Sequence, residues 1–142
     1  MGRKRHTVVD SLGLLVAVQV QPASVQDPTG APPVLVEAVA RAPTLRLLWG
    51  DGRYGGPTVG PAAAALGLRV EVVAKPSDQK GFAVLPHRWV VERAFGGLSK
   101  DRRVAGRDFE TNPRNSETWI HSCMSNLMVK RLARKIISKH PN

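Results

Sequence analysis

Two carboxylates stand where an α/β protein places its functional groups. Asp51 follows the compact apolar run 45–49, which predicts a buried strand, and loops at the carboxyl ends of strands are the usual ligand sites of open sheets. Glu92 lies one helical turn after Arg88, in a segment whose apolar spacing predicts a helix with this glutamate on its inner side. Carboxylates from separate elements at a solvent-open edge suit Mg²⁺, which prefers hard oxygen ligands. The pattern therefore predicts a divalent-metal site formed by Asp51 and Glu92.

The same residues also have ordinary structural explanations. Asp51-Gly52 is a common turn dipeptide. Arg88 and Glu92, at i and i+4, form a common surface ion pair of a helix, worth roughly a few tenths of a kcal/mol. Spacing alone favours these structural explanations over a metal site.

The start of the chain predicts a hairpin followed by a short helix. The β-branched runs His6–Asp10 and Leu14–Val20 flank a glycine-containing loop, which is typical of a hairpin. Gln26–Gly30 predicts a second loop, and the Pro32-Pro33 pair then leads into a helix at Val34–Ala40, because proline suits the first helical turn.

The middle of the chain predicts a strand, a helix and a second strand. Leu45–Trp49 is the first strand, and the alanine-rich segment Pro61–Leu66 is a helix that ends at Gly67. Leu68–Ala74 is the second strand. Strands that alternate with helices predict a mixed α/β domain in which crossover helices cover the sheet.

Two further helices are predicted downstream. The first begins near Pro86, and we expect it to break at Gly96-Gly97, because each glycine costs about 1 kcal/mol against alanine in a helix interior. Ser116 is the expected N-cap of a long final helix. Its apolar residues recur every four positions at Ile120, Met124, Met128, Leu132 and Ile136.

The charge balance predicts an anionic partner. Lys and Arg number 21 against 11 Asp and Glu, so the formal net charge is +10. Such a chain attracts polyanions, and nucleic acid is the commonest of them, because neutralised phosphates release counterions. An arginine-rich but otherwise ordinary surface is the alternative explanation.

Composition also bears on the compartment. The single cysteine, Cys123, excludes an intramolecular disulfide, and the four histidines are too scattered for a zinc module. The charged start followed by the apolar stretch Leu12–Val20 lacks a convincing cleavage motif, and it is far shorter than the roughly 18 apolar residues of a membrane span. We expect a cytoplasmic protein with no membrane contact.

Five segments, in order, resemble successive blocks of bacterial insertion-sequence DDE transposases with an RNase H-like catalytic fold. The resemblance runs over nearly the whole chain, and the ordered set is more specific than any one block. The segments are Gly2-Arg-Lys-Arg-His-Thr-Val-Val-Asp-Ser-Leu-Gly-Leu14, Val25-Gln-Asp27, Trp49-Gly-Asp-Gly-Arg-Tyr-Gly55, Lys80-Gly-Phe82 with Leu85-Pro-His-Arg-Trp-Val-Val-Glu-Arg-Ala-Phe95, and Asn126-Leu-Met128.

The resemblance implies roles for three residues. Asp51 matches the second catalytic aspartate, Glu92 the catalytic glutamate, and Arg88 the arginine of the signature Tyr-x2-Arg-x3-Glu-x6-Lys. Leu85 stands where that tyrosine would be and Ser99 where that lysine would be, with Lys100 one place later.

The first aspartate of the family lies on a strand that precedes the Gly2-Arg-Lys-Arg-His block, so we expect this chain to lack it, together with that central strand. Asp10 and Asp27 are weak substitutes, since the first falls in the hairpin turn and the second in a loop. We therefore expect residues 1–110 to form a partial RNase H-like catalytic domain. Residues 111–142 are expected to add a basic amphipathic helix that packs on it or extends it.

By resemblance, the complete protein cleaves and transfers DNA strands with Mg²⁺ or Mn²⁺, whereas this chain is expected to be inactive alone. Expected partners are double-stranded DNA, an upstream-encoded transposase segment and, in the complete protein, further copies of itself. The alternative is a non-catalytic basic DNA-binding or regulatory remnant. The residues expected to contact DNA are Arg93, Lys100, Arg102, Arg103, Arg107, Lys130, Arg131, Arg134 and Lys135.

Overall fold

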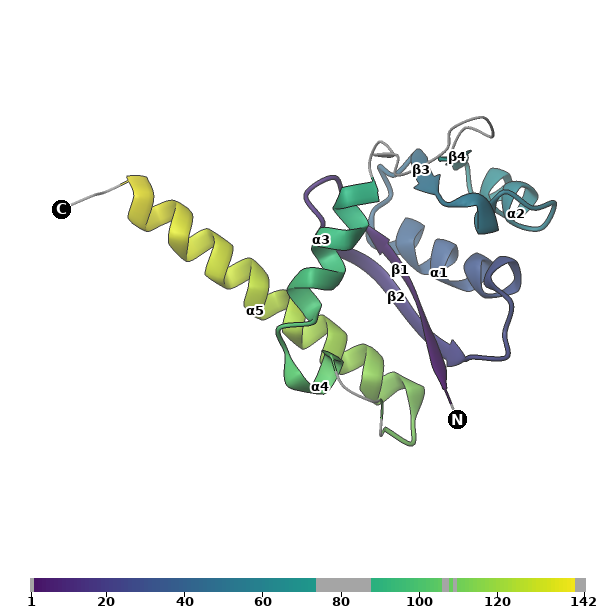
Figure 1. The fold of residues 1–142 in the computed structure, drawn as a ribbon. Helices are drawn as coiled ribbons and strands as arrows, with labels where there is room; N and C mark the ends of the chain where they lie inside the picture. The colour runs from purple at the N-terminus through teal and green to yellow at the C-terminus, as the bar shows by residue number, and fades with distance from the viewer. Residues whose placement is uncertain (1, 74–87, 106–107, 109, 140–142) are drawn as a thin grey trace, which may run out of the picture.

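The computed structural model describes residues 2–73, 88–105, 108 and 110–139, and it has a mixed α/β fold, as the sequence predicts (Figure 1). The elements run from a hairpin through a strand-helix-strand unit to three helices. In chain order they are β1 (Arg3–Val9), β2 (Leu15–Pro22), α1 (Asp27–Arg41), β3 (Leu47–Gly50), η1 (Gly52–Tyr54), α2 (Val59–Ala65), β4 (Arg69–Val72), α3 (Arg88–Leu98), α4 (Arg102–Ala105) and α5 (Pro113–Lys139). The predicted strand end at Ala74 and the helix start at Pro86 lie outside the described residues.

The predicted hairpin is confirmed as the antiparallel pair β1 and β2, with a register shift between Val8 and Val9. Its turn is closed by Asp10, whose carboxylate accepts the backbone N–H groups of Leu12 at 2.9 Å and Leu14 at 2.8 Å. Gly13 has φ +73°, and a Cβ there would lie 3.1 Å from the Val90 carbonyl oxygen. Asp10 is therefore a turn residue, and Gly13 permits α3 to approach the hairpin.

The predicted strand-helix-strand unit is also confirmed. β3 and β4 pair in parallel and are connected through α2, which is followed by Gly67 at φ +70°. β3 is less buried than its apolar sequence suggests, and Trp49 is 44% exposed. Within the described residues β3 has a strand partner on one side only, so much of its surface stays open.

The two sheets do not pair with each other among the described strands, but one apolar core joins them. Figure 1 shows α1 lying between the hairpin and the β3/β4 unit. Its buried side chains Val34, Leu35 and Ala38 belong to the same cluster as Val8 of the hairpin and Ala63 of α2. Two-stranded sheets are marginally stable alone, so this shared packing holds the pair of sheets together.

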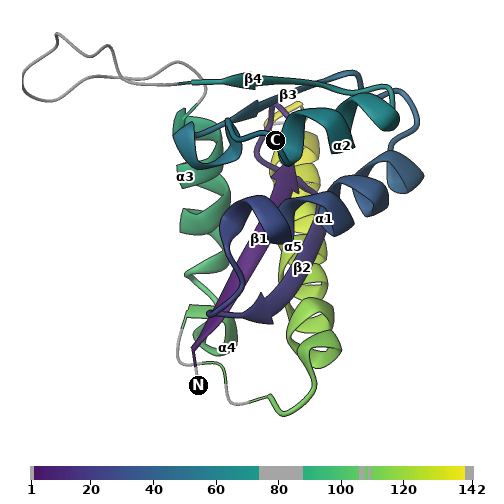
Figure 2. The same cartoon turned by 90° about the vertical axis from the view of Figure 1, so that its right-hand side faces the viewer.

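The opposite face of the hairpin packs on the C-terminal helices. Figure 2 shows β1 and β2 between α1 on one side and α5 on the other. The apolar side chains of Val18 and Val20 from β2 meet Ile120 and Met124 from α5. The Val20 N–H donates to the Glu117 carboxylate at 2.8 Å, so α5 also satisfies a backbone group of β2.

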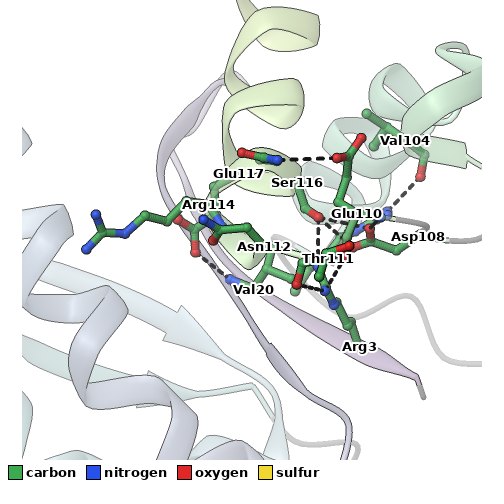
Figure 3. Close-up of polar contacts among 12 residues, drawn as sticks. Arg3, Val20, Val104, Asp108, Glu110, Thr111, Asn112, Arg114, Ser116 and Glu117 are labelled. Atoms are coloured by element: carbon green, nitrogen blue, oxygen red, sulfur yellow. Dashed lines mark hydrogen bonds and ion pairs between the residues drawn. The ribbon is translucent and has the colours of Figure 1, made fainter.

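The start of β1 is tied to the segment before α5 by Arg3 (Figure 3). Its guanidinium donates to the Glu110 and Thr111 carbonyls and to the Ser116 hydroxyl, and it lies 3.5 Å from the Asp108 carboxylate. Ser116 in turn donates to Asp108 at 2.8 Å. One polar cluster thus connects residues more than a hundred positions apart.

Two predicted helix starts are wrong. α1 begins at Asp27, so Gln26–Gly30 is mostly helical and Pro32 and Pro33 lie inside the helix. Proline removes a backbone donor there, and the burial of the apolar side of α1 against both sheets offsets that loss. α5 begins at Pro113, where Asn112 accepts the Arg114 N–H at 3.0 Å, while Ser116 is buried in the first turn.

The predicted break at Gly96-Gly97 is also wrong, because α3 continues to Leu98. A Cβ at Gly97 would lie 2.9 Å from Leu127 Cδ2. The glycine therefore permits close approach of α3 to α5, and this packing compensates for its low helix propensity.

Among the described side chains of the apolar stripe of α5, only those in the first half of the helix are buried. Ile120 and Met124 are buried, whereas Met128 is 41% and Leu132 is 61% exposed. Figure 1 shows the C-terminal half of α5 extending past the other elements. None of the helices in the described part of the chain is long and apolar enough to cross a membrane.

We predict that Gly30→Ala lowers the free energy of unfolding by about 1–3 kcal/mol, because a Cβ there would lie 2.5 Å from His6 Nε2 in a closely packed interior. Gly60→Ala is the matched control, since a Cβ at this exposed position of α2 meets no atom within 4 Å. The control should be neutral or stabilising by up to about 1 kcal/mol. Urea unfolding measures both, and equal stabilities of the two variants would contradict the packing argument.

Candidate functional site

Asp51 lies at the carboxyl end of β3, where the sequence places it. It is the N-cap of η1, and its Oδ1 accepts the Arg53 N–H at 2.9 Å. The residue is exposed to solvent. An aspartate at a strand end, oriented by a backbone donor and open to solvent, is suited to bind a cation or a substrate.

A cavity of about 230 Å³ opens beside Asp51. It lies where the start of β1, the start of α1 and η1 meet, so residues far apart in sequence share it. Its lining residues are Lys4, Arg5, His6, Asp27, Asp51, Arg53 and Tyr54. Sequence reasoning identified Asp51 and missed the others as a group, because no local pattern links positions 4–6 with 51–54.

Asp27 anchors the basic residues of this cavity. Its carboxylate lies 3.0 Å from Lys4 Nζ and 3.3 Å from Arg53 Nη1, and Lys4 also donates to the Val25 carbonyl at 2.9 Å. The hydrogen bond from Lys4 is the main cause that lowers the pKa of Asp27, and Arg53 adds to it. Both carboxylate oxygens face cations, so Asp27 acts as an ionic clamp between α1, β1 and η1.

His6 and Tyr54 form the neutral part of the site. His6 is 3% exposed, and its Nδ1 lies 3.4 Å from the Tyr54 hydroxyl. Burial lowers the pKa of His6, although the Asp27 carboxylate opposes this shift. Burial and then the carboxylates of Asp27 and Asp51 raise the pKa of Tyr54. Both side chains are therefore neutral at pH 7.

Glu92 and Arg88 lie on α3, as predicted, but Glu92 is exposed. The buried side chains of α3 that the structure describes are Val90, Ala94 and Leu98. Glu92 is exposed, so the expectation that it lies on the inner side is wrong. Arg88 is the first residue of α3, and its side chain lies outside the described part of the structure. Glu92 is not among the described residues that line the cavity beside Asp51.

The described residues alone do not form a complete metal centre. In that part of the chain no group of three or more His, Cys, Asp or Glu side chains could hold a metal ion. Asp51 fits one ligand position, since it offers a solvent-exposed carboxylate at a strand end.

The basic residues expected to contact DNA are distributed over the C-terminal helices and the turns between them. Arg131 is half-buried and donates to the Leu12 carbonyl at 3.1 Å. Arg103 stacks 4.2 Å from the centre of the Trp119 ring, and Arg107 lies outside the described residues. The exposed members are Arg93, Lys100, Arg102, Arg103, Lys130, Arg134 and Lys135.

Comparison with protein families matches residues 1–128 to the family described as the transposase DDE domain. No curated protein and no solved structure matches the chain. The family match includes β1, the strand end at Asp51, and α3 with Glu92.

We predict that Asp27→Asn destabilises the chain by about 1 kcal/mol at pH 7, because Lys4 and Arg53 lose their shared counter-charge. Folding lowers the pKa of Asp27 below its ordinary value of 3.8, so the clamp stabilises the fold above that pH and is lost as the pH falls further. The stability difference between the wild type and Asp27→Asn should therefore shrink below about pH 4.

Glu37→Gln is the control, because Glu37 pairs with Arg41 at the surface of the same helix. It should cost only roughly a few tenths of a kcal/mol. Urea unfolding at several pH values measures the three proteins. A difference for Asp27→Asn that stays constant down to about pH 2 would refute the ionic clamp.

Proposed function

Because the chain belongs to the transposase DDE domain family, we propose that it is the part of an insertion-sequence transposase that supplies two catalytic carboxylates, Asp51 and Glu92. Membership in the family establishes a role in DNA transposition. Transposases of this family act on DNA and use divalent metal ions. The observation that carries the proposal is the family match over residues 1–128, combined with the solvent-open position of Asp51 at the end of β3.

In this proposal Asp51 and Glu92 hold Mg²⁺ or Mn²⁺ in the complete protein. A bound ion of this kind activates a water or hydroxyl nucleophile and stabilises the charge that develops on phosphorus. Arg88 lies one turn before Glu92 on α3, where it can position a DNA phosphate or orient the glutamate. The exposure of Glu92 suits a site that must admit a double helix.

We further propose that an additional strand belongs between β1 and β3. The support is that each of these strands pairs on one side only within the described residues, although one apolar core runs beneath both sheets. A strand from an upstream transposase segment would join the two sheets into one and bring the first aspartate of the triad toward Asp51. In this division, residues 1–110 form the partial catalytic domain and 111–142 its basic C-terminal helix.

The exposed cations of α3, α4 and α5 and of the turns between them supply the proposed contacts to DNA backbone. Contacts of this kind give affinity with little sequence preference. A complete transposase assembled from several copies, acting in the cytoplasm, fits this proposal.

The second candidate function is a non-catalytic DNA-binding or regulatory remnant, which the excess of basic side chains favours equally.

We predict that the chain alone has negligible DNA cleavage activity with Mg²⁺ or Mn²⁺, because two carboxylates leave at least one metal under-ligated. DNA binding should persist, and it should survive Asp51→Asn, because this substitution removes a negative charge and no phosphate contact. A nicking assay and a filter-binding assay measure the two properties. Robust cleavage that Asp51→Asn abolishes would show that the site is complete without an upstream segment.

DNA binding should also fall steeply with added salt, and Arg134→Ala should reduce the slope of log K against log [salt] by about 1. Arg46→Ala is the matched control, because Arg46 is exposed but its guanidinium donates to the Pro43 and Leu45 carbonyls of its own loop. Equal slopes for the two variants would show that Arg134 of α5 does not contact the DNA backbone.

We predict that the upstream segment stabilises the chain. Unpaired backbone groups cost roughly 1–3 kcal/mol each where they stay buried, and total domain stability is only about 5–15 kcal/mol. The chain expressed alone should therefore aggregate or unfold over a broad temperature range. Co-expression with the upstream segment should yield a soluble complex with a sharper transition at higher temperature. A monomer that unfolds cooperatively without any partner would contradict the open-edge argument.

A further inference from the structure

Two buried polar atoms beside the cavity lack hydrogen-bond partners among the described residues, and both lie against Gly30 of α1. They are His6 Nε2 and Gln21 Oε1. A Cβ built at Gly30 would lie 2.5 Å from the first atom and 2.6 Å from the second. Both atoms therefore lie around the same point, although they do not hydrogen-bond to each other in this structure.

The orientation of the Gln21 amide determines which of the two atoms must donate. Gln21 Nε2 donates to the Gly30 carbonyl at 3.3 Å and to Gln19 Oε1 at 3.4 Å. A carbonyl oxygen can only accept, so the amide nitrogen must face Gly30 O, and Oε1 is left as a buried acceptor without a partner. Oε1 therefore needs a hydrogen-bond donor, and the other unpartnered atom at this point, His6 Nε2, can supply an N–H.

We infer that His6 is a positioning residue for the loop that carries Asp51, acting as the neutral Nε2–H tautomer that donates to Gln21 Oε1 and accepts the Tyr54 hydroxyl at Nδ1. The inference about the loop's purpose rests on the proposed function, in which Asp51 is a metal ligand. The tautomer itself rests on the contact between Nδ1 and the Tyr54 hydroxyl and on the two unpartnered buried atoms, and it does not depend on a metal ion.

The three side chains of Gln21, His6 and Tyr54, called the relay below, join three elements through buried or half-buried groups. Gln21 belongs to β2, His6 to β1 and Tyr54 to η1. The backbone N–H of Tyr54 donates to the Asp51 carbonyl at 3.0 Å, and a Cβ at Gly50 would lie 3.1 Å from Tyr54 Cβ. Tyr54 therefore packs on the end of β3 and bonds to Asp51, so fixing its hydroxyl fixes the start of η1.

The groups that face the imidazole favour its neutral form. Lys4 lies on the same strand, Tyr54 approaches from η1, and Asp27 approaches from α1. Burial and Lys4 lower the pKa of His6, while Asp27 raises it, and burial is the largest effect. The imidazole is thus uncharged at pH 7, as a group that accepts at Nδ1 must be.

The test is NMR of the full chain labelled with ¹⁵N in its histidines, in which the missing signal of His6→Gln assigns His6. Long-range ¹H–¹⁵N correlations should show the Nε2–H tautomer at pH 7 and titration below pH 6.5, the ordinary value for histidine. Tyr54→Phe removes only the hydroxyl, so the fold should survive. It should shift the Nδ1 resonance and speed hydrogen exchange of the backbone amide at position 54 about five- to tenfold.

His121→Gln is the matched control, because His121 is a half-buried histidine of α5 that belongs to neither the cavity nor η1. It should leave the His6 tautomer and the exchange of η1 amides unchanged. An Nδ1–H tautomer or a charged imidazole at pH 7 would overturn the inference. Hydrogen exchange of the η1 amides at the same rate in Tyr54→Phe and in the wild type would also overturn it.

Titration with Mn²⁺ separates this inference from the proposed function. Paramagnetic broadening of the Gly52 and Arg53 amides would support a metal at Asp51, and Tyr54→Phe should lower the Mn²⁺ affinity about five- to tenfold if the relay positions the loop. If Mn²⁺ broadens these amides but His6 is the Nδ1–H tautomer, the inference about His6 is wrong and the metal site stands. If His6 is the Nε2–H tautomer and Mn²⁺ broadens no amide near Asp51, the inference about His6 stands and the result counts against the metal site.

Discussion

The packing of α1 against both sheets is the contact on which the rest of the structure depends. Each sheet has only two strands within the described residues, and a two-stranded sheet has too little apolar surface to be stable in water. The buried side of α1, from Gly30 to Ala38, covers the hairpin and reaches α2 and η1. Without this helix, the end of β3 and the hairpin would have no fixed relation, and Asp51 would have no cavity beside it.

The same packing explains why some local predictions failed. The hairpin, the α2 crossover and the Gly67 cap were predictable, because alternation and a left-handed glycine act within a few residues. The start of α1 was not, since two internal prolines are tolerated only through burial on distant strands. Gly97 likewise stays helical because Leu127 packs against it, which no property of α3 alone reveals.

The candidate site divides in the same way. The place of Asp51 was predictable because a short apolar run ending in Gly-Asp-Gly marks a strand end, whereas its role as a metal ligand is a proposal. Asp27 was considered only as a weak substitute for a missing aspartate, and His6 and Tyr54 were not singled out. Their contacts join residues more than 20 positions apart, which no spacing rule connects. The exposed position of Glu92 differs from the inward one expected from helical periodicity, which locates the apolar face of α3 but not the purpose of the polar one.

The contacts divide the basic residues behind the net charge of +10 into two groups. Arg3, Lys4 and Arg5 near the start of the chain donate to carbonyls or carboxylates of the protein itself, so they serve the fold. Lys130 and Arg134 on α5 are exposed beyond the last buried apolar contacts of that helix. Because phosphate affinity depends on cations that remain accessible, the DNA contacts proposed above fall on the C-terminal helices, on the face of the hairpin opposite α1. The basic residues that serve the fold and those proposed to attract DNA are thus different sets.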